Sequence, residues 1–329
     1  MTIRYCLHQV ESPLQTNQTT KPFLRIGTRG SLLALAQAKL VQSKLAKFNG
    51  VDAKDIHIEV IKTSGDIIQD RPLSEVGGKG LFTKEIEVAL LENRIDIGVH
   101  SSKDVATQLP DGLGMFAFLQ REDVRDAFVS LNYKSVDDLP EGATFGTSSL
   151  RRAAQMLRHR PDLKIVEFRG NVQTRMKKLE DGVADATLLA YAGLRRLGQT
   201  HIARQMIDPN VFMPAPAQGA IGIEARQDDT RTRDLIALLN HSGTAAALVA
   251  ERHFLHGLDG SCRTPIGAYT EIDGNDMKVI GQVLSLDGTT AFEGEVTGHV
   301  ADCEEIGQHL AQILREQAGE KFFESFEVR

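Results

Sequence analysis

Between residues 23 and 225, short apolar runs of strand length alternate with stretches of helical periodicity. Apolar residues three and four apart, preceded by Ser, Thr or Asn, predict helices that begin near residues 31, 83, 150 and 172, and a further short helix is expected at 192–197. Strands that alternate with helices in this way are typical of α/β folds. The predicted strands are 23–27, 56–62, 95–100, 115–119, 126–130, 144–146, 164–168, 186–190 and 219–225.

The pattern changes after residue 228. Helical spacing predicts helices at 229–240, 244–256 and 303–317, and the turn Asp287-Gly288 predicts an antiparallel pair of strands at 278–286 and 290–296. Residues 257–267, GLDGSCRTPIG, are expected to form a loop. The C-terminal part is therefore predicted to be a small α+β domain.

Two stretches, the polar residues 120–123 and the Pro-rich residues 212–218, are expected to carry the chain between two α/β units and back. We therefore predict two α/β domains, like the lobes of a periplasmic binding protein, joined by two crossings and followed by the small α+β domain. Residues 1–20 are polar and are expected to be a flexible extension. The predicted boundaries are domain 1 at 21–119 and 219–238, domain 2 at 120–218, and domain 3 at 239–329.

Composition restricts the partners. A net charge of −6 and a pI near 6.0 argue against a general nucleic-acid binder, and the absence of Trp leaves little for base stacking. No apolar run approaches the ~20 residues that span a bilayer, and residues 1–20 lack the apolar core of a signal peptide. Three cysteines, Cys6, Cys262 and Cys303, without Cys/His metal spacing predict a reduced, cytoplasmic protein with no metal site.

Positive charge is concentrated between residues 146 and 196, where eleven Lys and Arg stand against five Asp and Glu. Several of these arginines follow predicted strands, which is where α/β units hold their ligands. Because a guanidinium binds a carboxylate through two parallel hydrogen bonds, the pattern indicates a polyanionic small molecule in an Arg-rich cleft. We assign that role to Arg151, Arg152, Arg169 and Arg175, and we expect Arg158, Arg160, Lys177 and Lys178 to face solvent.

Arg29 and Asp104 also stand where predicted strands end. Arg29 precedes a helix N-terminus, where a cation is unfavourable without an anion, and a ligand contact and an exposed loop position remain equally compatible. Asp104 is compatible with a simple cap of the next turn. A carboxylate beside an anion site is also the group that stabilises a cationic transition state or moves a proton.

Two further segments allow more than one interpretation. Residues 63–80 are a long Gly-containing stretch typical of a mobile functional loop, and residues 77–80 lack the Ser or Thr of a phosphate-binding loop. Cys262 is either a small buried apolar residue or a nucleophilic or covalently modified thiol, which the adjacent Arg263 favours.

Eight motifs from residue 25 to residue 269 resemble the porphobilinogen deaminase family, whose members are also called hydroxymethylbilane synthases. The motifs are RIGTRGSLLALAQA (25–38), EVGGKGLFTKEIEVALLENRIDIGVHSSKDV (75–105), REDVRDAFVS (121–130), GTSSLRR (146–152), FRGNVQTR (168–175), LAYAGLRRLG (189–198), PAPAQGAIGIE (214–224) and GSCRTPIGAY (260–269). Together they are highly specific.

The resemblance implies a transferase of tetrapyrrole and haem biosynthesis. It implies that four porphobilinogen molecules are condensed head to tail, with loss of ammonia, to give 1-hydroxymethylbilane. It also implies a dipyrromethane cofactor that primes the chain and is held by a thioether on Cys262. Asp104 matches the family's catalytic aspartate, whose proposed role is to stabilise the cation that remains when ammonia leaves.

Motif matches imply the binding residues as well. The cofactor-binding candidates are Lys103, Asp104, Ser149, Arg151, Arg152 and Cys262. The substrate-binding candidates are Arg25, Arg29, Lys79, Phe82, Ser101, Arg169, Arg175 and Arg196. Residues 64–80 match the family's mobile active-site loop.

Departures from the family pattern are modest. Ala106, Ala217 and Ser261 replace residues that are more frequent in the family, and none of the three removes a charged or nucleophilic group. The resemblance implies a monomer that acts on a small molecule, with neither nucleic acid nor membrane as partner. The alternative is a two-lobed organic-anion binding module, which has no use for Cys262 or Asp104.

Overall fold

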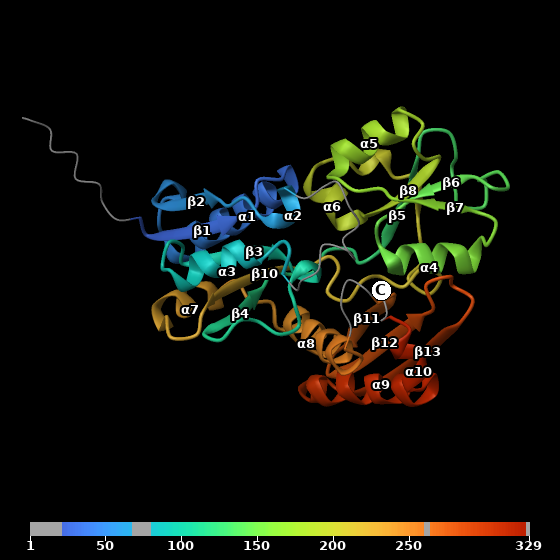
Figure 1. The fold of residues 1–329 in the computed structure, drawn as a ribbon. Helices are drawn as coiled ribbons and strands as arrows, with labels where there is room; N and C mark the ends of the chain where they lie inside the picture. Colours follow the sequence, from blue (N-terminus) through green and yellow to red (C-terminus); the bar gives the residue numbers. More distant parts are fainter. Residues whose placement is uncertain (1–21, 68–79, 260–263, 327–329) are drawn as a thin grey trace, which may run out of the picture.

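The computed structural model describes residues 22–67, 80–259 and 264–326, which form three units, each built around its own sheet (Figure 1). We call them the first lobe (blue and cyan, with β10 and α7), the second lobe (green and yellow) and the third domain (orange and red).

The first lobe contains a mixed sheet in the order β2-β1-β3-β10-β4. Strand β1 pairs parallel with β2 and β3, whereas β10 is antiparallel to β3 and β4. Its strands are β1 (Leu24–Thr28), β2 (Ile56–Val60), β3 (Ile97–Ser101), β4 (Leu113–Phe118) and β10 (Ile221–Arg226). Its helices are α1 (Leu32–Asn49), α2 (Ser64–Ile67), α3 (Lys84–Leu91) and α7 (Thr230–Ala237).

The second lobe repeats this plan in the order β7-β6-β8-β5-β9. Strand β6 pairs parallel with β7 and β8, whereas β5 is antiparallel to β8 and β9. Its strands are β5 (Asp126–Ser130), β6 (Thr144–Gly146), β7 (Lys164–Val166), β8 (Ala186–Ala190) and β9 (Gln205–Met206). Its helices are α4 (Leu150–His159), α5 (Val172–Glu180) and α6 (Tyr191–Arg196).

The chain passes between the lobes twice. It leaves the first lobe after β4 and enters the second at β5, and it returns to the first lobe at β10. The two crossings are hydrogen-bonded to each other, because Arg121 Nε donates to the carbonyl of Gln218 at 2.8 Å. They also approach closely at Gly219, where a Cβ atom would lie 2.5 Å from the carbonyl oxygen of Glu122, and its φ of +91° also favours glycine.

The third domain packs α8 (Ser242–Gly257) and α9 (Cys303–Ala318) on a three-stranded antiparallel sheet, followed by α10 (Glu320–Glu324). The strands are β11 (Ile266–Asp273), β12 (Asp276–Leu284) and β13 (Ala291–His299). The sequence predicted two strands here, and the structure has three, because β11 was not predicted. Its first four residues are all buried, so it lacks the alternation of a half-exposed strand.

Each sheet has an apolar core of its own. Ile26, Val99 and Ile223 are buried between the strands and helices of the first lobe, and Phe128 and Phe145 hold the same place in the second. Burial of one such side chain contributes about 1.5–3 kcal/mol to the free energy of folding. The apolar core of each lobe therefore stabilises the sheet of that lobe.

The predicted fold class, two α/β lobes with two crossings and a small α+β domain, is confirmed. The domain boundaries given above stay predictions. Ser31 caps α1 as expected, because its hydroxyl accepts the backbone N–H of Ala34 at 3.2 Å. In the described ranges, no helix has both the length and the apolar character needed to cross a membrane.

Candidate active site

Asp104 ends a short 3-10 helix, η2 (Ser102–Asp104), that continues from the C-terminal end of β3. Its side chain is half-buried, and its carboxylate forms no hydrogen bond or ion pair with any described residue. The turn after it is fixed by Arg252 of α8, which donates to the carbonyls of Val105 at 3.2 Å and Ala106 at 2.6 Å. The third domain therefore holds the turn in place and leaves the Asp104 carboxylate available to a ligand.

Lys103 is the neighbour of Asp104 and bonds to a crossing between the lobes. Its Nζ atom donates to Oε1 of Gln218 at 3.1 Å. Burial and the positive charge of Arg152 lower the pKa of Lys103 to about 8, while Asp104 and Asp126 act in the opposite direction. The ammonium is thus held in surroundings that disfavour its charge, and an added ligand carboxylate would stabilise it.

Arg151 and Arg152 lie in the first turn of α4 and are only 5% and 6% exposed. Both bind the fully buried carboxylate of Asp126 on β5, through Arg151 Nη2 at 2.8 Å and through Arg152 Nε at 3.1 Å and Nη2 at 2.7 Å. Burial opposes ionisation of Asp126, but the charges of Arg152 and Arg151 outweigh it and hold the Asp126 pKa well below its usual range.

The other nitrogen atoms of this arginine pair are partly engaged as well. Arg151 Nη1 donates to the carbonyl of Met213 at 2.5 Å, and Arg152 Nη1 donates to that of Leu188 at 2.9 Å. Arg151 Nε is buried and has no hydrogen-bond partner among the described residues. The pair therefore offers a ligand its charge and a few N–H groups, rather than two open guanidinium forks.

Arg175 and Arg196 have no carboxylate partner among the described residues. Burial and the charge of Arg152 lower the pKa of Arg175 to about 10, and burial lowers that of Arg196 to about 10. Arg175 Nε donates to the Gly170 carbonyl at 3.0 Å. Arg169, in the turn before α5, is buried and adds to the positive charge that acts on Arg175. Arg175 and Arg196 thus lie in a partly buried cationic region and form no ion pair with a described residue.

The predicted substrate arginines of the first lobe are arranged differently. Arg25 binds both carboxylate oxygens of Asp96, through Nε at 3.1 Å and Nη2 at 2.6 Å. Arg29 binds both oxygens of Asp66, through Nε at 3.2 Å and Nη2 at 2.5 Å, and its guanidinium lies 4.1 Å from the centre of the Phe82 ring. Phe82 is thus in contact with a predicted binding residue, and each arginine has a carboxylate of its own.

The two serines on the predicted site are occupied in hydrogen bonds. Ser101 Oγ accepts from Nε2 of the buried Gln37 at 2.9 Å. Ser149 is the N-cap of α4, and its Oγ accepts the backbone N–H of Arg152 at 3.4 Å. Lys79 and Cys262 lie outside the described residues, so their placement in the site stays a prediction.

Sequence reasoning missed two residues at the centre of the cluster, Asp126 and Gln218. Asp126 is the first residue of β5 and was assigned only to a strand, although it stands in a motif with Arg121 and Arg125. Gln218 was assigned only to a crossing, yet its Nε2 donates to Val124 O at 2.7 Å and to Asp126 Oδ1 at 2.9 Å. A polar residue in a crossing, between apolar neighbours, was the signal that could have identified Gln218.

Helix α8 also fixes the crossings beside the site. Glu251, fully buried, accepts from Arg121 Nη1 at 2.6 Å and Nη2 at 3.0 Å, and from the backbone N–H of Ala217 at 2.6 Å. Together with the bonds of Arg252 to the turn after Asp104, these contacts connect two consecutive residues of α8 to both sides of the cluster. The described part of the third domain thereby supports the geometry of the site.

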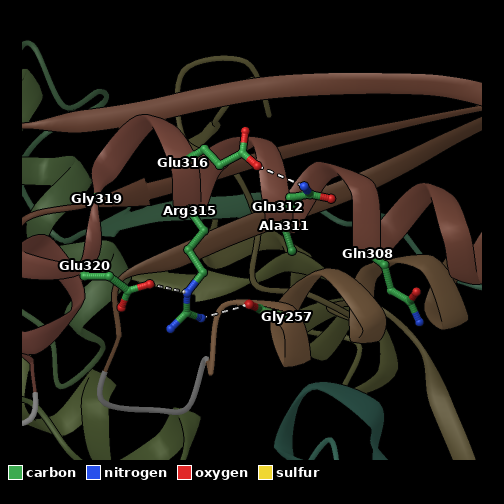
Figure 2. A pocket seen from close by; sticks show the side chains of 8 residues that line it. All are labelled: Gly257, Gln308, Ala311, Gln312, Arg315, Glu316, Gly319 and Glu320. Atoms are coloured by element: carbon green, nitrogen blue, oxygen red, sulfur yellow. Dashed lines mark hydrogen bonds and ion pairs between the residues drawn. The ribbon is translucent and has the colours of Figure 1, made fainter.

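A hollow of about 440 Å³ lies elsewhere, in the third domain among α8, α9 and α10 (Figure 2). Its most prominent cation, Arg315, is already engaged by the carbonyl of Gly257 at 3.0 Å, by Asp259 at 2.9 Å and by Glu320 at 3.4 Å. The hollow has none of the unpaired cations of the main cluster. Within the described ranges, no group of three His, Cys, Asp or Glu side chains is arranged to hold a metal ion.

Comparison with known proteins gives two family matches. Residues 24–234 match the family model "Porphobilinogen deaminase, dipyromethane cofactor binding domain", and residues 245–316 match "Porphobilinogen deaminase, C-terminal domain". Among solved structures, the methionine binding protein MetQ covers 65% of this chain and 88% of its own at 16% identity, with a TM-score of 0.42. That structural likeness is too low to support an inference.

Curated relatives agree with the family models. A porphobilinogen deaminase of Paracoccus denitrificans is 53% identical over 92% of this chain and 96% of its own length. One of Nitrobacter hamburgensis is 53% identical over 95% of this chain and 99% of its own. Since both family models and near full-length relatives agree, the chain belongs to the porphobilinogen deaminase family.

Proposed function

We propose that this member of the family is a transferase, a hydroxymethylbilane synthase that condenses four porphobilinogen molecules head to tail with loss of ammonia. The observation that carries the proposal is the cluster around η2, where the Asp104 carboxylate, which has no partner among the described residues, lies in the same charged group as Lys103, Arg152 and Arg175. Each pyrrole ring bears an acetate and a propionate, so a growing chain needs many cations. The ring N–H groups need a hydrogen-bond acceptor, and the cation left by ammonia needs a negative charge nearby. A carboxylate supplies both.

The second lobe supplies the part that binds carboxylates. Arg175 and Arg196 form no ion pair among the described residues, and burial lowers the pKa of both guanidinium groups. A carboxylate that reaches these groups relieves this unfavourable burial, since an opposite charge within a few ångströms stabilises a buried cation. Substrate and intermediates are therefore bound here by their acid side chains, with the pyrrole rings left free to react.

The dipyrromethane cofactor of the family fits the same residues. Arg151 Nε, Arg196 Nε and Ser102 Oγ are buried donors with no partner among the described residues, and such groups are costly unless an acceptor is present. A group with four carboxylates supplies such acceptors. When bound, the cofactor supplies the free pyrrole carbon to which the first substrate is joined. Cys262 is the proposed anchor, and in the sequence it comes shortly after α8 of the third domain.

Asp104 is the proposed catalytic residue. Its half-buried carboxylate is positioned to accept hydrogen bonds from pyrrole N–H groups. As the aminomethyl group of porphobilinogen loses ammonia, positive charge spreads over that ring, and a fixed carboxylate stabilises it more strongly than water does. Because Arg252 fixes the turn after Asp104, the carboxylate needs little reorganisation during the reaction.

We further propose that the protein works as a monomer in the cytoplasm, where reducing conditions keep the Cys262 thiol free for thioether formation. The family membership and the biosynthetic activity support this location. The alternative function, an organic-anion binding module, is not favoured, because it leaves the unpartnered Asp104 carboxylate without a role.

The test is to incubate the purified protein with porphobilinogen and to measure substrate consumed, ammonia released and hydroxymethylbilane formed. We expect one ammonia for each porphobilinogen consumed and a product of four rings. Binding of porphobilinogen without release of ammonia would instead support the binding module.

A further inference from the structure

The carboxylate of Asp126 is saturated with hydrogen bonds. It accepts four, one from Arg151, two from Arg152 and one from Gln218. A carboxylate has about four lone-pair positions, so Asp126 has no capacity left for substrate. Its side chain is also fully buried, on a strand whose backbone is paired with β8. Asp126 is therefore a fixed part of the site and takes no direct part in binding.

Gln218 extends this arrangement to the other lobe. Its amide nitrogen donates to Asp126 at 2.9 Å and its amide oxygen accepts from Lys103 Nζ at 3.1 Å. Gln218 is fully buried, and its backbone bonds to the opposite crossing through Arg121. One continuous set of hydrogen bonds therefore runs from the catalytic turn of the first lobe to the arginine pair of the second.

Asp126 is also the buried negative charge inside the cationic cluster. Its charge acts on Lys103 and Arg175 in addition to its two bonded arginines. The charged groups that face Lys103 are Arg152, Arg151, Asp104 and Asp126. Without Asp126, the arginines would repel one another and Lys103 at close range, and of the guanidinium bonds described above only those to the carbonyls of Met213 and Leu188 would still hold the pair.

We propose that Asp126 is a positioning residue for the condensation, which orients Arg151 and Arg152 and, through Gln218, sets Lys103 and the Asp104 turn against them. The inference rests on the proposed function and deepens it. The orientation matters because the carboxylates of the ligand are bound by one lobe while the charge of the reaction develops beside the other. A small error in this alignment costs about 100-fold in rate.

The first test is Asp126→Asn, which keeps the shape of the side chain and removes its charge. We expect kcat to fall about 10- to 100-fold in the folded, cofactor-loaded fraction, which is measured by intact mass. We also expect the alkaline limb of the pH–rate profile to move to lower pH. The reason is that Asp126 raises the pKa of Lys103, so that its loss leaves Lys103 neutral at a lower pH.

The second test is Gln218→Met, which leaves every charge in place and removes the link from Lys103 to Asp126, together with the bond to Val124 O. The matched control is Gln155→Met. Gln155 is also a buried glutamine, on α4, that donates to Met213 O at 3.1 Å and forms no hydrogen bond with Asp126 or Lys103. We expect Gln218→Met to lower kcat about tenfold and Gln155→Met to stay within about twofold of the wild type.

The outcomes separate positioning from stability. The proposal would be overturned by a folded Asp126→Asn enzyme whose pH–rate profile has its alkaline limb at the same pH as the wild type, whatever its kcat. Asp126 would then be a structural residue only. If Asp126→Asn does not fold, Gln218→Met decides: a tenfold loss supports the proposal, and equality with Gln155→Met overturns it. The wild-type enzyme in the same assay tests the proposed function separately, since its inactivity would refute the function and not only this inference.

Discussion

The two lobes differ in how their arginines are paired with carboxylates. In the first lobe, Arg25 binds Asp96 and Arg29 binds Asp66, so each predicted binding arginine is paired with a separate acid, although Arg226 also lies 3.7 Å from Asp96. In the second lobe, Arg151 and Arg152 share the single carboxylate of Asp126, and Arg175 and Arg196 form no ion pair with any described residue.

This difference divides the work of the site between the lobes. The uncompensated positive charge lies in the second lobe, on Arg175 and Arg196, and suits the carboxylates of a growing pyrrole chain. The free carboxylate lies in the first lobe, on Asp104, and suits the cation formed when ammonia leaves. In the proposed function, one lobe would therefore bind the substrate's anionic groups, and the other would stabilise its reacting ring.

Removing the free carboxylate is expected to have the largest effect. Asp104→Ala should lower kcat by about 10²- to 10⁴-fold, because a fixed charge at the reacting ring is lost. The melting temperature should stay unchanged, since Asp104 forms no hydrogen bond or ion pair with a described residue. Turnover close to that of the wild type would contradict the division between the lobes.

Removing an unpaired cation of the second lobe should weaken binding. Arg175→Gln is expected to raise KM about tenfold, because a buried cation bound to a carboxylate contributes about 1.5–3 kcal/mol. The control is Arg158→Gln on the exposed side of α4, for which we expect no change. Steady-state kinetics at fixed salt give the comparison, and equal KM values for the two variants would count against it.

Lys103 should make binding depend on pH. Its pKa is lowered to about 8 by burial and Arg152, so its charge is lost as the pH rises through that value. We expect KM to rise above pH 8 in the wild type and to stay flatter in Lys103→Arg, whose guanidinium remains charged. A profile that is the same in both proteins would show that Lys103 does not bind carboxylates.

The paired arginines of the first lobe should act mainly on stability. Arg25→Met leaves the half-buried Asp96 carboxylate without its main partner, and we expect a loss of about 1–3 kcal/mol in the free energy of unfolding. The kinetic constants of the folded fraction should change less than threefold, a factor that corresponds to about 0.65 kcal/mol. A large rise in KM with unchanged stability would place Arg25 with the unpaired arginines instead.

The smallest expected effect is at the crossing between the lobes. Ala217 has a φ of +63°, a region where glycine is favoured and alanine is strained. Ala217→Gly should therefore raise the free energy of unfolding by about 1 kcal/mol, with kinetics unchanged, as measured by chemical denaturation. A lower stability of Ala217→Gly would show that the hydrogen bond from the backbone N–H of residue 217 to Glu251 needs the alanine side chain.

The fold was largely readable from the sequence because its strands are short apolar runs and its helices begin at Ser31, Ser149 and Asn171, which cap them through side-chain hydrogen bonds. The strand β11 was not readable. Its burial is continuous at first and it follows a Gly-bounded segment that resembles a loop. Apolar runs of this kind do not distinguish a buried strand from other buried segments.

The sequence predicted which types of residue form the site. It did not predict which arginine is paired with which carboxylate. The sequence places Arg25 and Asp96 71 positions apart and Arg29 and Asp66 37 positions apart, so no local pattern connects them. Asp126 and the arginines it holds are also separated, by 25 positions in the case of Arg151. Which arginine is neutralised and which is left for a ligand is decided by how the strands are ordered in the two sheets.

The most direct test of the account is an intact mass spectrum of the denatured protein, recorded beside Cys262→Ala and, as a control, Cys303→Ala, whose thiol is half-buried in the third domain. The account predicts an adduct equal to two porphobilinogen units less their ammonia, present in the wild type and in Cys303→Ala and absent from Cys262→Ala. A wild-type protein that stays unmodified after incubation with porphobilinogen or preformed hydroxymethylbilane would contradict it.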